Sequence, residues 1–252
     1  MSLQALIFDV DGTLADTERD GHRPAFNAAF REAGLDWNWD AALYGKLLAV
    51  TGGKERMQYY VEAFHADFKK PADFNELVAD LHKAKTRHYT TMLAKGEIPM
   101  RPGVKRLLNE ARKAGLRLAI ATTTTPENVT ALLEHSLGKS SSKWFEVIAA
   151  GDIVPAKKPA PDIYVWALAQ MQLAPQHCLA FEDSENGIRS SLGAGLKTLI
   201  TTNGYTHDHN FSGAAVVLSD LGEPDAPATA LSGAWKGQGY VTLESLRILH
   251  RG

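Results

Sequence analysis

The chain has 252 residues, enough for one large α/β domain or for a core with a smaller companion, and its 44% hydrophobic content excludes a disordered protein. Its 27 basic and 29 acidic residues leave a net charge of −2, so no overall cationic field exists that would hold nucleic acid or an anionic membrane. The single cysteine, Cys178, excludes an intrachain disulfide and a cysteine-rich zinc site.

The first predicted element is a buried strand at residues 5–8, a short run of bulky apolar side chains that a loop follows. This run lacks the length and the basic flank of a signal peptide, and no other run in the sequence approaches the length of a membrane span. We therefore expect a monomeric protein of the cytoplasm, or of an organelle stroma after removal of a transit peptide. We expect neither nucleic acid nor a membrane as a partner.

Residues 17–96 carry a helical pattern without a strand signal. Apolar side chains recur there at the spacing of an amphipathic helix, and Gly34 ends the first helix. The apolar faces consist of Phe26, Ala29, Phe30 and Ala33, then Met57, Tyr60, Val61 and Phe64, then Phe74, Leu77, Val78 and Leu81. We expect a small helical bundle and interpret its aromatic side chains as core packing.

From Pro102 onward, helical and strand patterns alternate. Strands are predicted over 116–121, 145–149, 178–181, 198–202 and 215–218, and helices over 104–114, 126–138, 161–173, 184–193 and 243–249. Thr125 and Ser184 are expected N-caps, and residues 222–239, rich in Gly, Pro, Ala and Ser, are expected to form a loop. Alternation predicts a parallel sheet with helices on both faces. We therefore expect a Rossmann-like α/β core formed by residues 1–16 and 97–252, with residues 17–96 inserted as a helical cap domain.

Ligands of open α/β sheets bind beyond the carboxyl ends of the strands. Here these positions carry carboxylates, hydroxyls and ammonium groups: Asp9 and Asp11, then threonines 122–125, then Lys157 and Lys158, then Glu182, Asp183 and Ser184. Carboxylates are ligands that Mg²⁺ prefers, whereas hydroxyls, helix N-termini and lysine suit phosphate oxygens. The combination predicts a site for a metal-bound phosphate.

The pair Asp9 and Asp11 is weak evidence by itself, because an Asp-Gly turn is common in loops. Four ordered motifs are stronger evidence, and they resemble those of the haloacid dehalogenase superfamily. They are DxDGT at Asp9–Thr13, a strand that ends in a hydroxyl residue at Thr122, KPxPD at Lys158–Asp162, and an acidic pair at Glu182–Asp183. The inserted helices also fall where the type I cap of that family belongs.

The resemblance implies roles for these residues. Asp9 is the nucleophile that forms an aspartyl-phosphate, and Asp11 is the general acid and then the general base. Mg²⁺ is held by Asp9, by the backbone carbonyl of Asp11 and by Asp183, with Glu182 a ligand directly or through one water. Dehalogenases of the superfamily lack the second aspartate, so Asp11 favours phosphotransfer.

Two further core residues have implied roles. Thr122 donates to a phosphoryl oxygen, and Lys158 pairs with the nucleophile and the transferring group. Thr123 is a candidate substrate contact, although it could equally be no more than a strand-end residue.

Two segments of the expected cap are candidate substrate contacts. Glu18 and His22 follow the first motif by about one helical turn and face back toward it. The small-residue turn of Thr51, Gly52, Gly53 and Lys54 leads into a helix, so its N–H groups and the ammonium of Lys54 would receive an anion. The alternative is that the glycines only separate two helices and that Lys54 and Arg56 are solvated.

The segments 51–56 and 121–128 resemble the CbbY-like branch of the family. Its members remove the 1-phosphate from xylulose-1,5-bisphosphate, a misfire product that inhibits Rubisco in the Calvin cycle. This resemblance implies a Mg²⁺-dependent phosphatase that produces xylulose 5-phosphate and phosphate. A sugar-phosphate mutase similar to β-phosphoglucomutase, which carries a histidine near the position of His22, stays open as an alternative. So does a non-catalytic sugar-phosphate sensor, although a sensor need not keep the nucleophile Asp9.

Overall fold

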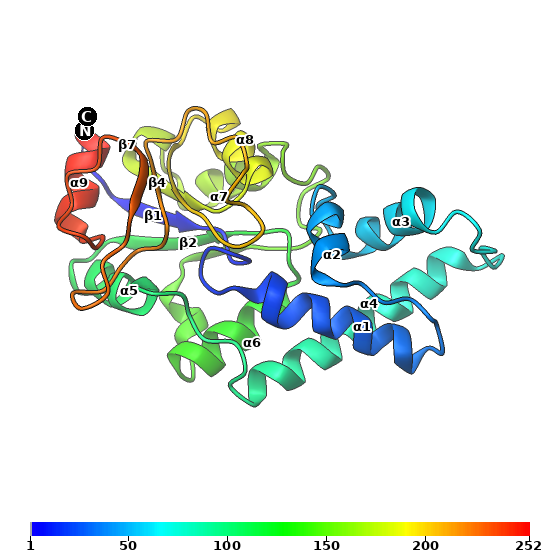
Figure 1. The fold of residues 1–252 in the computed structure, drawn as a ribbon. Coiled ribbons are helices and arrows are strands. Elements are labelled where there is room, and N and C mark those ends of the chain that lie inside the picture. Colours follow the sequence, from blue (N-terminus) through cyan, green and yellow to red (C-terminus); the bar gives the residue numbers. More distant parts are fainter. Residues whose placement is uncertain (1) are drawn as a thin grey trace.

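A seven-stranded sheet lies at the centre of the core (Figure 1) in the computed structural model, which describes residues 2–252. The order across the sheet is β3–β2–β1–β4–β5–β6–β7; β1 to β6 run parallel, and β7 runs antiparallel to β6. The strands are β1 (Ala5–Phe8), β2 (Arg117–Ala121), β3 (Val147–Ala149), β4 (Cys178–Glu182), β5 (Lys197–Thr201), β6 (Val216–Leu218) and β7 (Ala230–Gly233). Because the chain leaves β1 for β2 on one side and reaches β4 on the other, the carboxyl end of β1 is the point where ligands of such sheets bind.

Helices cover both faces of the sheet, which explains the uninterrupted apolar run of β1. Leu6 and Phe8 pack with residues of α5, α6 and α9, whereas Ala5 and Ile7 face the other way and pack with α7. Helix α8 lies on the same side of the sheet as α7. The helices of the core are α5 (Val104–Lys113), α6 (Pro126–Leu137), α7 (Asp162–Met171), α8 (Glu185–Gly193) and α9 (Leu243–Arg251). Burial on two faces therefore fixes β1 in the middle of the core.

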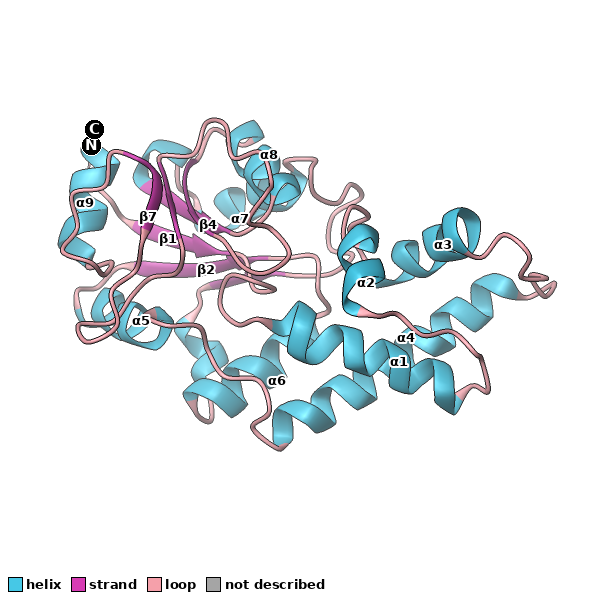
Figure 2. Ribbon diagram, in the orientation of Figure 1, coloured by secondary structure: helices cyan, strands magenta, loops and turns pink. Residues whose placement is uncertain are grey.

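The helices between β1 and α5 form a separate lobe beside the sheet (Figure 2). After a π-helical turn at Glu18–His22 they are α1 (Arg23–Glu32), α2 (Ala41–Leu47), α3 (Gly53–Phe64) and α4 (Phe74–Ala94). The lobe has its own hydrophobic cluster, which is rich in aromatic side chains such as Phe30 and Trp39. A cluster of its own supports the interpretation of residues 17–96 as a domain, but the boundaries of that domain stay a prediction.

Helix α4 belongs to both hydrophobic clusters. Val78 and Leu81 in its first half pack in the lobe, whereas Tyr89 and Leu93 in its second half pack in the core cluster. The helix therefore joins the lobe to the core as one continuous rod of 21 residues.

The expected α/β class with a parallel sheet and an inserted helical segment is confirmed, and most predicted elements lie within a few residues of their expected bounds. The interpretation of residues 222–239 as a loop is wrong in part, because β7 lies within this segment. Its four residues are exposed, so it has no apolar periodicity, and pairing with β6 alone makes it a strand. Ser184 caps α8 as expected, whereas Thr125 precedes α6 but makes no side-chain cap bond.

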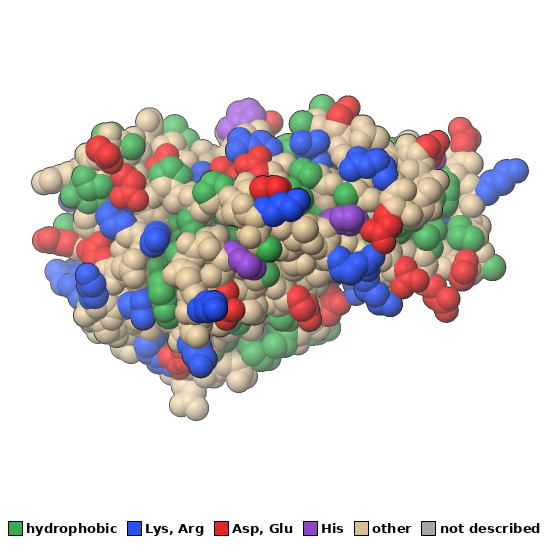
Figure 3. Space-filling model, turned by 90° about the horizontal axis from the view of Figure 1, so that it is seen from below, with side chains coloured by type: hydrophobic (Ala, Val, Ile, Leu, Met, Phe, Trp, Pro, Cys, Tyr) green, Lys and Arg blue, Asp and Glu red, His purple; other side chains and the backbone are tan. Residues whose placement is uncertain are grey.

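Charged side chains of both signs are interspersed over the face seen in Figure 3, in keeping with a net charge of −2. Among residues 2–252, no helix combines the length and the apolar composition that a membrane crossing requires.

The bonds of Asn27 to the backbone of Trp39 give a test of the packing of the lobe. The amide of Asn27 donates to Trp39 O at 2.9 Å and accepts from Trp39 N at 2.8 Å, and both residues are buried. We expect Asn27→Ala to lower the free energy of unfolding by about 1–3 kcal/mol, because two buried backbone groups lose their partners. Urea denaturation followed by tryptophan fluorescence measures the change.

The matched control is Gln58→Ala, since the bond from Gln58 to Asn75 is exposed. This variant should stay within about 0.5 kcal/mol of the wild type. Equal losses in both variants would show that the buried bonds of Asn27 have no special weight.

Candidate active site

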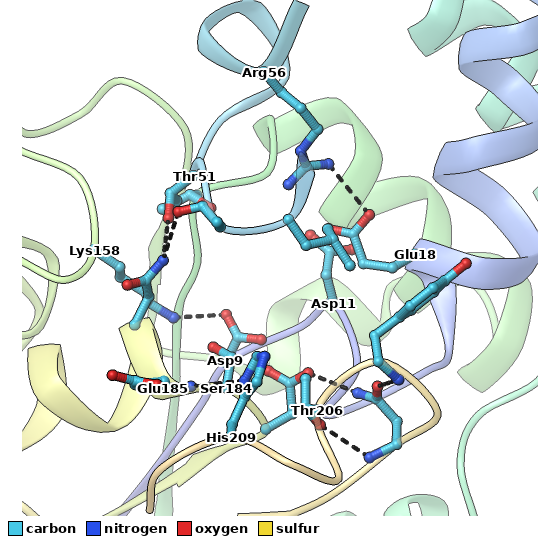
Figure 4. Close-up of a pocket in the computed structure, with 17 residues that line it drawn as sticks. Asp9, Asp11, Glu18, Thr51, Arg56, Lys158, Ser184, Glu185, Thr206 and His209 are labelled. Carbon is cyan, nitrogen blue, oxygen red and sulfur yellow. Dashed lines mark hydrogen bonds and ion pairs between the residues drawn. The ribbon is translucent and has the colours of Figure 1, made fainter. Parts of the chain in front are cut away.

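A cavity of about 310 Å³ lies between the helical lobe and the carboxyl ends of the strands. The lobe contributes Glu18, Leu48, Ala49, Thr51 and Arg56, and the remaining lining residues include Asp9, Asp11, Thr123, Lys158 and Asp183. In Figure 4, Arg56 lies on the side of this cavity opposite to Asp9, Thr206 and His209. The cavity thus brings together many of the polar residues that follow different strands in the sequence.

The ammonium of Lys158 joins the carboxylates at the ends of β1 and β4. Its Nζ donates to Asp9 Oδ1 at 2.7 Å and to Glu182 Oε1 at 2.5 Å, and the Tyr164 hydroxyl donates to the same Glu182 oxygen at 2.6 Å. All four side chains are buried. Burial alone would lower the pKa of Lys158, but Asp9 and Glu182 outweigh it and raise this pKa, so the lysine stays charged.

The carboxylates of Asp9, Glu182 and Asp183 offer oxygens that all lie within 4.8 Å of one another. Burial, against the opposing charge of Lys158, raises the pKa of Asp9 to about 7, and burial together with repulsion from Asp9 and Glu182 raises the pKa of Asp183 well above its usual range. One ammonium therefore does not offset the negative charge of the cluster. A divalent cation with a preference for oxygen ligands fits this donor set.

Two glycines that lie against these carboxylates leave no room for a larger residue. Gly12 has a φ of +87°, and a Cβ there would lie 2.1 Å from Asp183 Oδ2. A Cβ on Gly187 would lie 1.8 Å from Glu182 Oε2. The amide of Asn203, which also lies next to Gly12, donates to Asp183 Oδ2 at 2.7 Å. The orientations of both acidic side chains are therefore fixed by the backbone next to them.

Asp11 lies outside this cluster and faces the helical lobe. Its Oδ1 accepts from Thr17 Oγ1 at 2.6 Å and lies 2.8 Å from His22 Nε2, and the ammonium of Lys85 lies 2.8 Å from His22 Nδ1. Burial alone would raise the pKa of Asp11, but the charge and hydrogen bonds of His22, with the bond from Thr17, lower it to about 2. The expected orientation of His22 toward the first motif is seen, whereas Thr17 and Lys85 were not predicted.

The cap cation that lines the cavity is Arg56, not Lys54. Arg56 is only 6% exposed, and its Nη1 lies 2.8 Å from the hydroxyl of Tyr44, which itself bonds to Glu18. The alternative that Arg56 is solvated is therefore wrong. Lys54 instead pairs at 2.8 Å with Asp152, and its side chain is 41% exposed.

The glycines before Lys54 allow two close approaches: Gly52 lies against the core, and Gly53 lies against α4 within the lobe. A Cβ on Gly52 would lie 2.8 Å from Lys157 Nζ, and one on Gly53 would lie 2.9 Å from His82. Lys157 crosses to the lobe and bonds Glu55 at 2.6 Å. Gly52 and Gly53 line a narrow cavity of about 40 Å³ next to the main one, so they border the site without forming its wall.

The three predicted threonines lie in different places relative to the cavity. Thr122 is buried at the end of β2, and Thr123 lines both cavities. Thr51 lines the main cavity and accepts a bond from Asn186 Nδ2 at 3.2 Å, so a lobe residue is tied there to the start of α8.

A loop after β5 forms a wall of the cavity that the sequence did not indicate. Asn203, Tyr205, Thr206 and His209 line the cavity, and the ring of Tyr205 packs against Tyr44 of the lobe with 6.0 Å between ring centroids. The loop matches no motif, and the only signal in the sequence was its position directly after a predicted strand.

The comparisons with known proteins agree with this geometry. A model of the haloacid dehalogenase-like hydrolase family matches residues 3–207. The plasmid protein CbbY of Cupriavidus necator is 46% identical over 99% of this chain and 98% of its own length, and CbbY of Rhodobacter capsulatus is 50% identical over 88% and 95%.

A solved structure of a CbbY mutant from Rhodobacter sphaeroides in complex with xylulose-(1,5)bisphosphate has a TM-score of 0.80 and 44% identity, and the match covers 86% of this chain and 94% of that one. The family model matches well over half of the chain, and the relatives match nearly all of it. The chain therefore belongs to the haloacid dehalogenase-like hydrolases, within their CbbY branch, and is a phosphomonoester hydrolase.

Proposed function

We propose that this phosphatase hydrolyses xylulose-1,5-bisphosphate to xylulose 5-phosphate and phosphate, with Mg²⁺ as its cofactor. The observation that carries the proposal is one cavity with two charged ends: the cluster of Asp9, Lys158 and Asp183 at its floor and Arg56 on its opposite side. Such a cavity suits a small molecule with two phosphates. The relative that is solved with xylulose-(1,5)bisphosphate supports this choice of sugar.

Asp9 acts as the nucleophile in the proposed reaction. Its carboxylate oxygen attacks phosphorus, the bond from phosphorus to the sugar oxygen breaks, and an aspartyl-phosphate forms. Lys158 orients the carboxylate through its 2.7 Å bond and offsets the negative charge that gathers on the transferring group. Asp9, Asp183 and Glu182 would hold Mg²⁺, which relieves their mutual repulsion and polarises the phosphoryl oxygens when bound.

Asp11 moves the protons. It donates one to the departing sugar oxygen; it then takes one from the water that attacks the aspartyl-phosphate, which frees phosphate and restores Asp9. In the ligand-free protein its pKa is lowered to about 2. The negative charge of an entering phosphate raises this pKa by repulsion. His22 Nε2, 2.8 Å away, passes its proton to Asp11 while Lys85 Nζ gives one to His22 Nδ1, so the imidazole stays neutral and the ammonium of Lys85 becomes an amine.

Phosphate release from a panel of sugar phosphates tests the reaction and the substrate. We expect xylulose-1,5-bisphosphate to give the highest kcat/KM, with xylulose 5-phosphate as the product. Asp9→Asn should lose at least about 10⁴-fold in kcat, because an amide cannot attack phosphorus. Isomerised product without phosphate would instead indicate a mutase. Binding of the sugar phosphates without turnover of any of them would indicate a sensor.

A thermal-shift experiment tests the metal site without relying on activity. Saturating Mg²⁺ should raise the Tm of the wild type, because a ligand at about 100 times its Kd stabilises the folded state by about 2.7 kcal/mol. Asp183→Asn removes one of the three clustered carboxylates, so its Tm should respond much less to Mg²⁺. An equal response in both proteins would mean that the cation binds elsewhere.

A pair of cap variants tests the second phosphate site. Arg56→Lys keeps the charge but cannot match the planar guanidinium, so KM for the bisphosphate should rise about tenfold or more. KM for a monophosphate should rise less, because it lacks the group that Arg56 would bind. Lys54→Ala, at an exposed position two residues away, is the matched control and should change both KM values little. A larger effect of Lys54→Ala than of Arg56→Lys would reverse the assignment.

A further inference from the structure

The loop after β5 presents a histidine to the cavity that the proposed mechanism does not use. Four of its residues line the cavity, and His209 is the one among them with an imidazole ring. It lies on the same side of the cavity as Thr206 and Asp9 (Figure 4). A ring in this place can contact the part of a substrate that extends away from the reacting phosphate.

The position of His209 is fixed by its neighbours. Its backbone N–H donates to Thr206 O at 3.1 Å, and its Nδ1 accepts from the backbone N–H of Glu185 at 3.2 Å. Its ring also lies 6.2 Å from the ring of Phe211, which packs on the hydrophobic cluster of Ile188. The ring is therefore held between the start of α8 and the core rather than free in solvent.

These contacts determine which nitrogen carries the proton. Because Nδ1 accepts a hydrogen bond, the neutral ring has its proton on Nε2. Among residues 2–252, no side-chain or backbone group accepts from this Nε2. The ring thus keeps one N–H donor available to a ligand.

Three other polar side chains on this side of the cavity already have protein partners. Asn203 donates to Asp183, Asn186 donates to Thr51 and to Ala49 O, and Ser184 Oγ accepts from Gly187 N as the cap of α8. These bonds orient the carboxylate of Asp183, tie the lobe to α8 and cap α8, respectively. The Tyr205 hydroxyl also has no hydrogen-bond partner among the described residues, but this atom is buried and out of reach of a ligand. The free donor of His209 is therefore the feature of this wall best suited to recognise a substrate.

We propose that His209 determines substrate specificity by donating from Nε2 to a hydroxyl or keto oxygen of the sugar in the leaving group. This inference rests on the proposed function, because it requires a sugar phosphate in the cavity. It predicts that the enzyme prefers phosphates of sugars, whose leaving group carries such an oxygen, over alkyl and aryl phosphates. The reacting groups at the floor of the cavity contact only the phosphate and cannot distinguish these substrates.

Two substitutions separate this role from a structural one. In His209→Asn the amide oxygen takes the place of Nδ1 and still accepts from Glu185 N, but nothing replaces Nε2. In His209→Gln the longer side chain places an amide N–H near the former Nε2 and loses the acceptor for Glu185 N. Kinetics with xylulose-1,5-bisphosphate and with p-nitrophenyl phosphate, which has no sugar oxygen, compare the two variants with the wild type.

We expect His209→Asn to lower kcat/KM for the sugar bisphosphate by about tenfold, mainly through KM, and to stay within about twofold of the wild type for p-nitrophenyl phosphate. His209→Gln should retain more of the activity on the sugar. Unchanged sugar kinetics in His209→Asn would overturn the inference. So would a loss of equal size for both substrates, since that indicates a role in holding the loop.

The wild-type data in the same experiment test the proposed function separately. If the wild type prefers another sugar phosphate, xylulose-1,5-bisphosphate is excluded as the substrate, and the variants are compared on the preferred one. If it prefers no sugar phosphate to p-nitrophenyl phosphate, both proposals are wrong.

Discussion

The bond of the Lys158 ammonium to two buried carboxylates is the interaction on which the site depends. Parallel pairing of β1 with β4 brings Asp9 and Glu182 to the same edge of the sheet, where burial makes their charges costly. Lys158 offsets part of this cost, and the two carboxylates raise its pKa so that it stays charged. The remaining negative charge on Asp9 and Asp183 is what makes the cluster suited to a cation. The same burial that stabilises the fold thus leaves a group of carboxylates whose repulsion a cation would relieve.

The two parts of the molecule divide the chemistry between them. The core supplies the carboxylate cluster on a rigid sheet edge, and the helical lobe supplies His22 and Lys85 behind Asp11 and Arg56 across the cavity. Asp9 and Asp11 are two residues apart, yet the first faces Lys158 and the second faces His22, and their pKa values move in opposite directions. Distinct partners on opposite sides of one short loop therefore prepare two aspartates for different roles.

Much of the fold was predictable because β1, β2, β4 and β5 are buried runs between helices with clear apolar faces. Strand β7 was not, since its exposed residues leave no periodic signal. The motif residues were identified by type and spacing, but not Lys85 or His209, whose placement depends on packing between distant segments. Lys54 and Arg56 show the limit most clearly: residues two apart on a helix face different directions, and the sequence does not reveal which of them turns inward.

Because helix α4 spans the lobe and the core, a rotation about its core end would move its two ends by different distances. Its far end is rooted in the aromatic cluster of the lobe, and its near end, at Tyr89 and Leu93, is rooted in the core. At about 1.5 Å per residue, Phe74 lies roughly 22 Å from Tyr89 and Lys85 only about 6 Å from it. A swing of about 10° around that fulcrum would carry Phe74 by about 4 Å but Lys85 by only about 1 Å. Such a swing would displace the far end of the lobe while Lys85, whose ammonium lies 2.8 Å from His22 Nδ1, scarcely shifts.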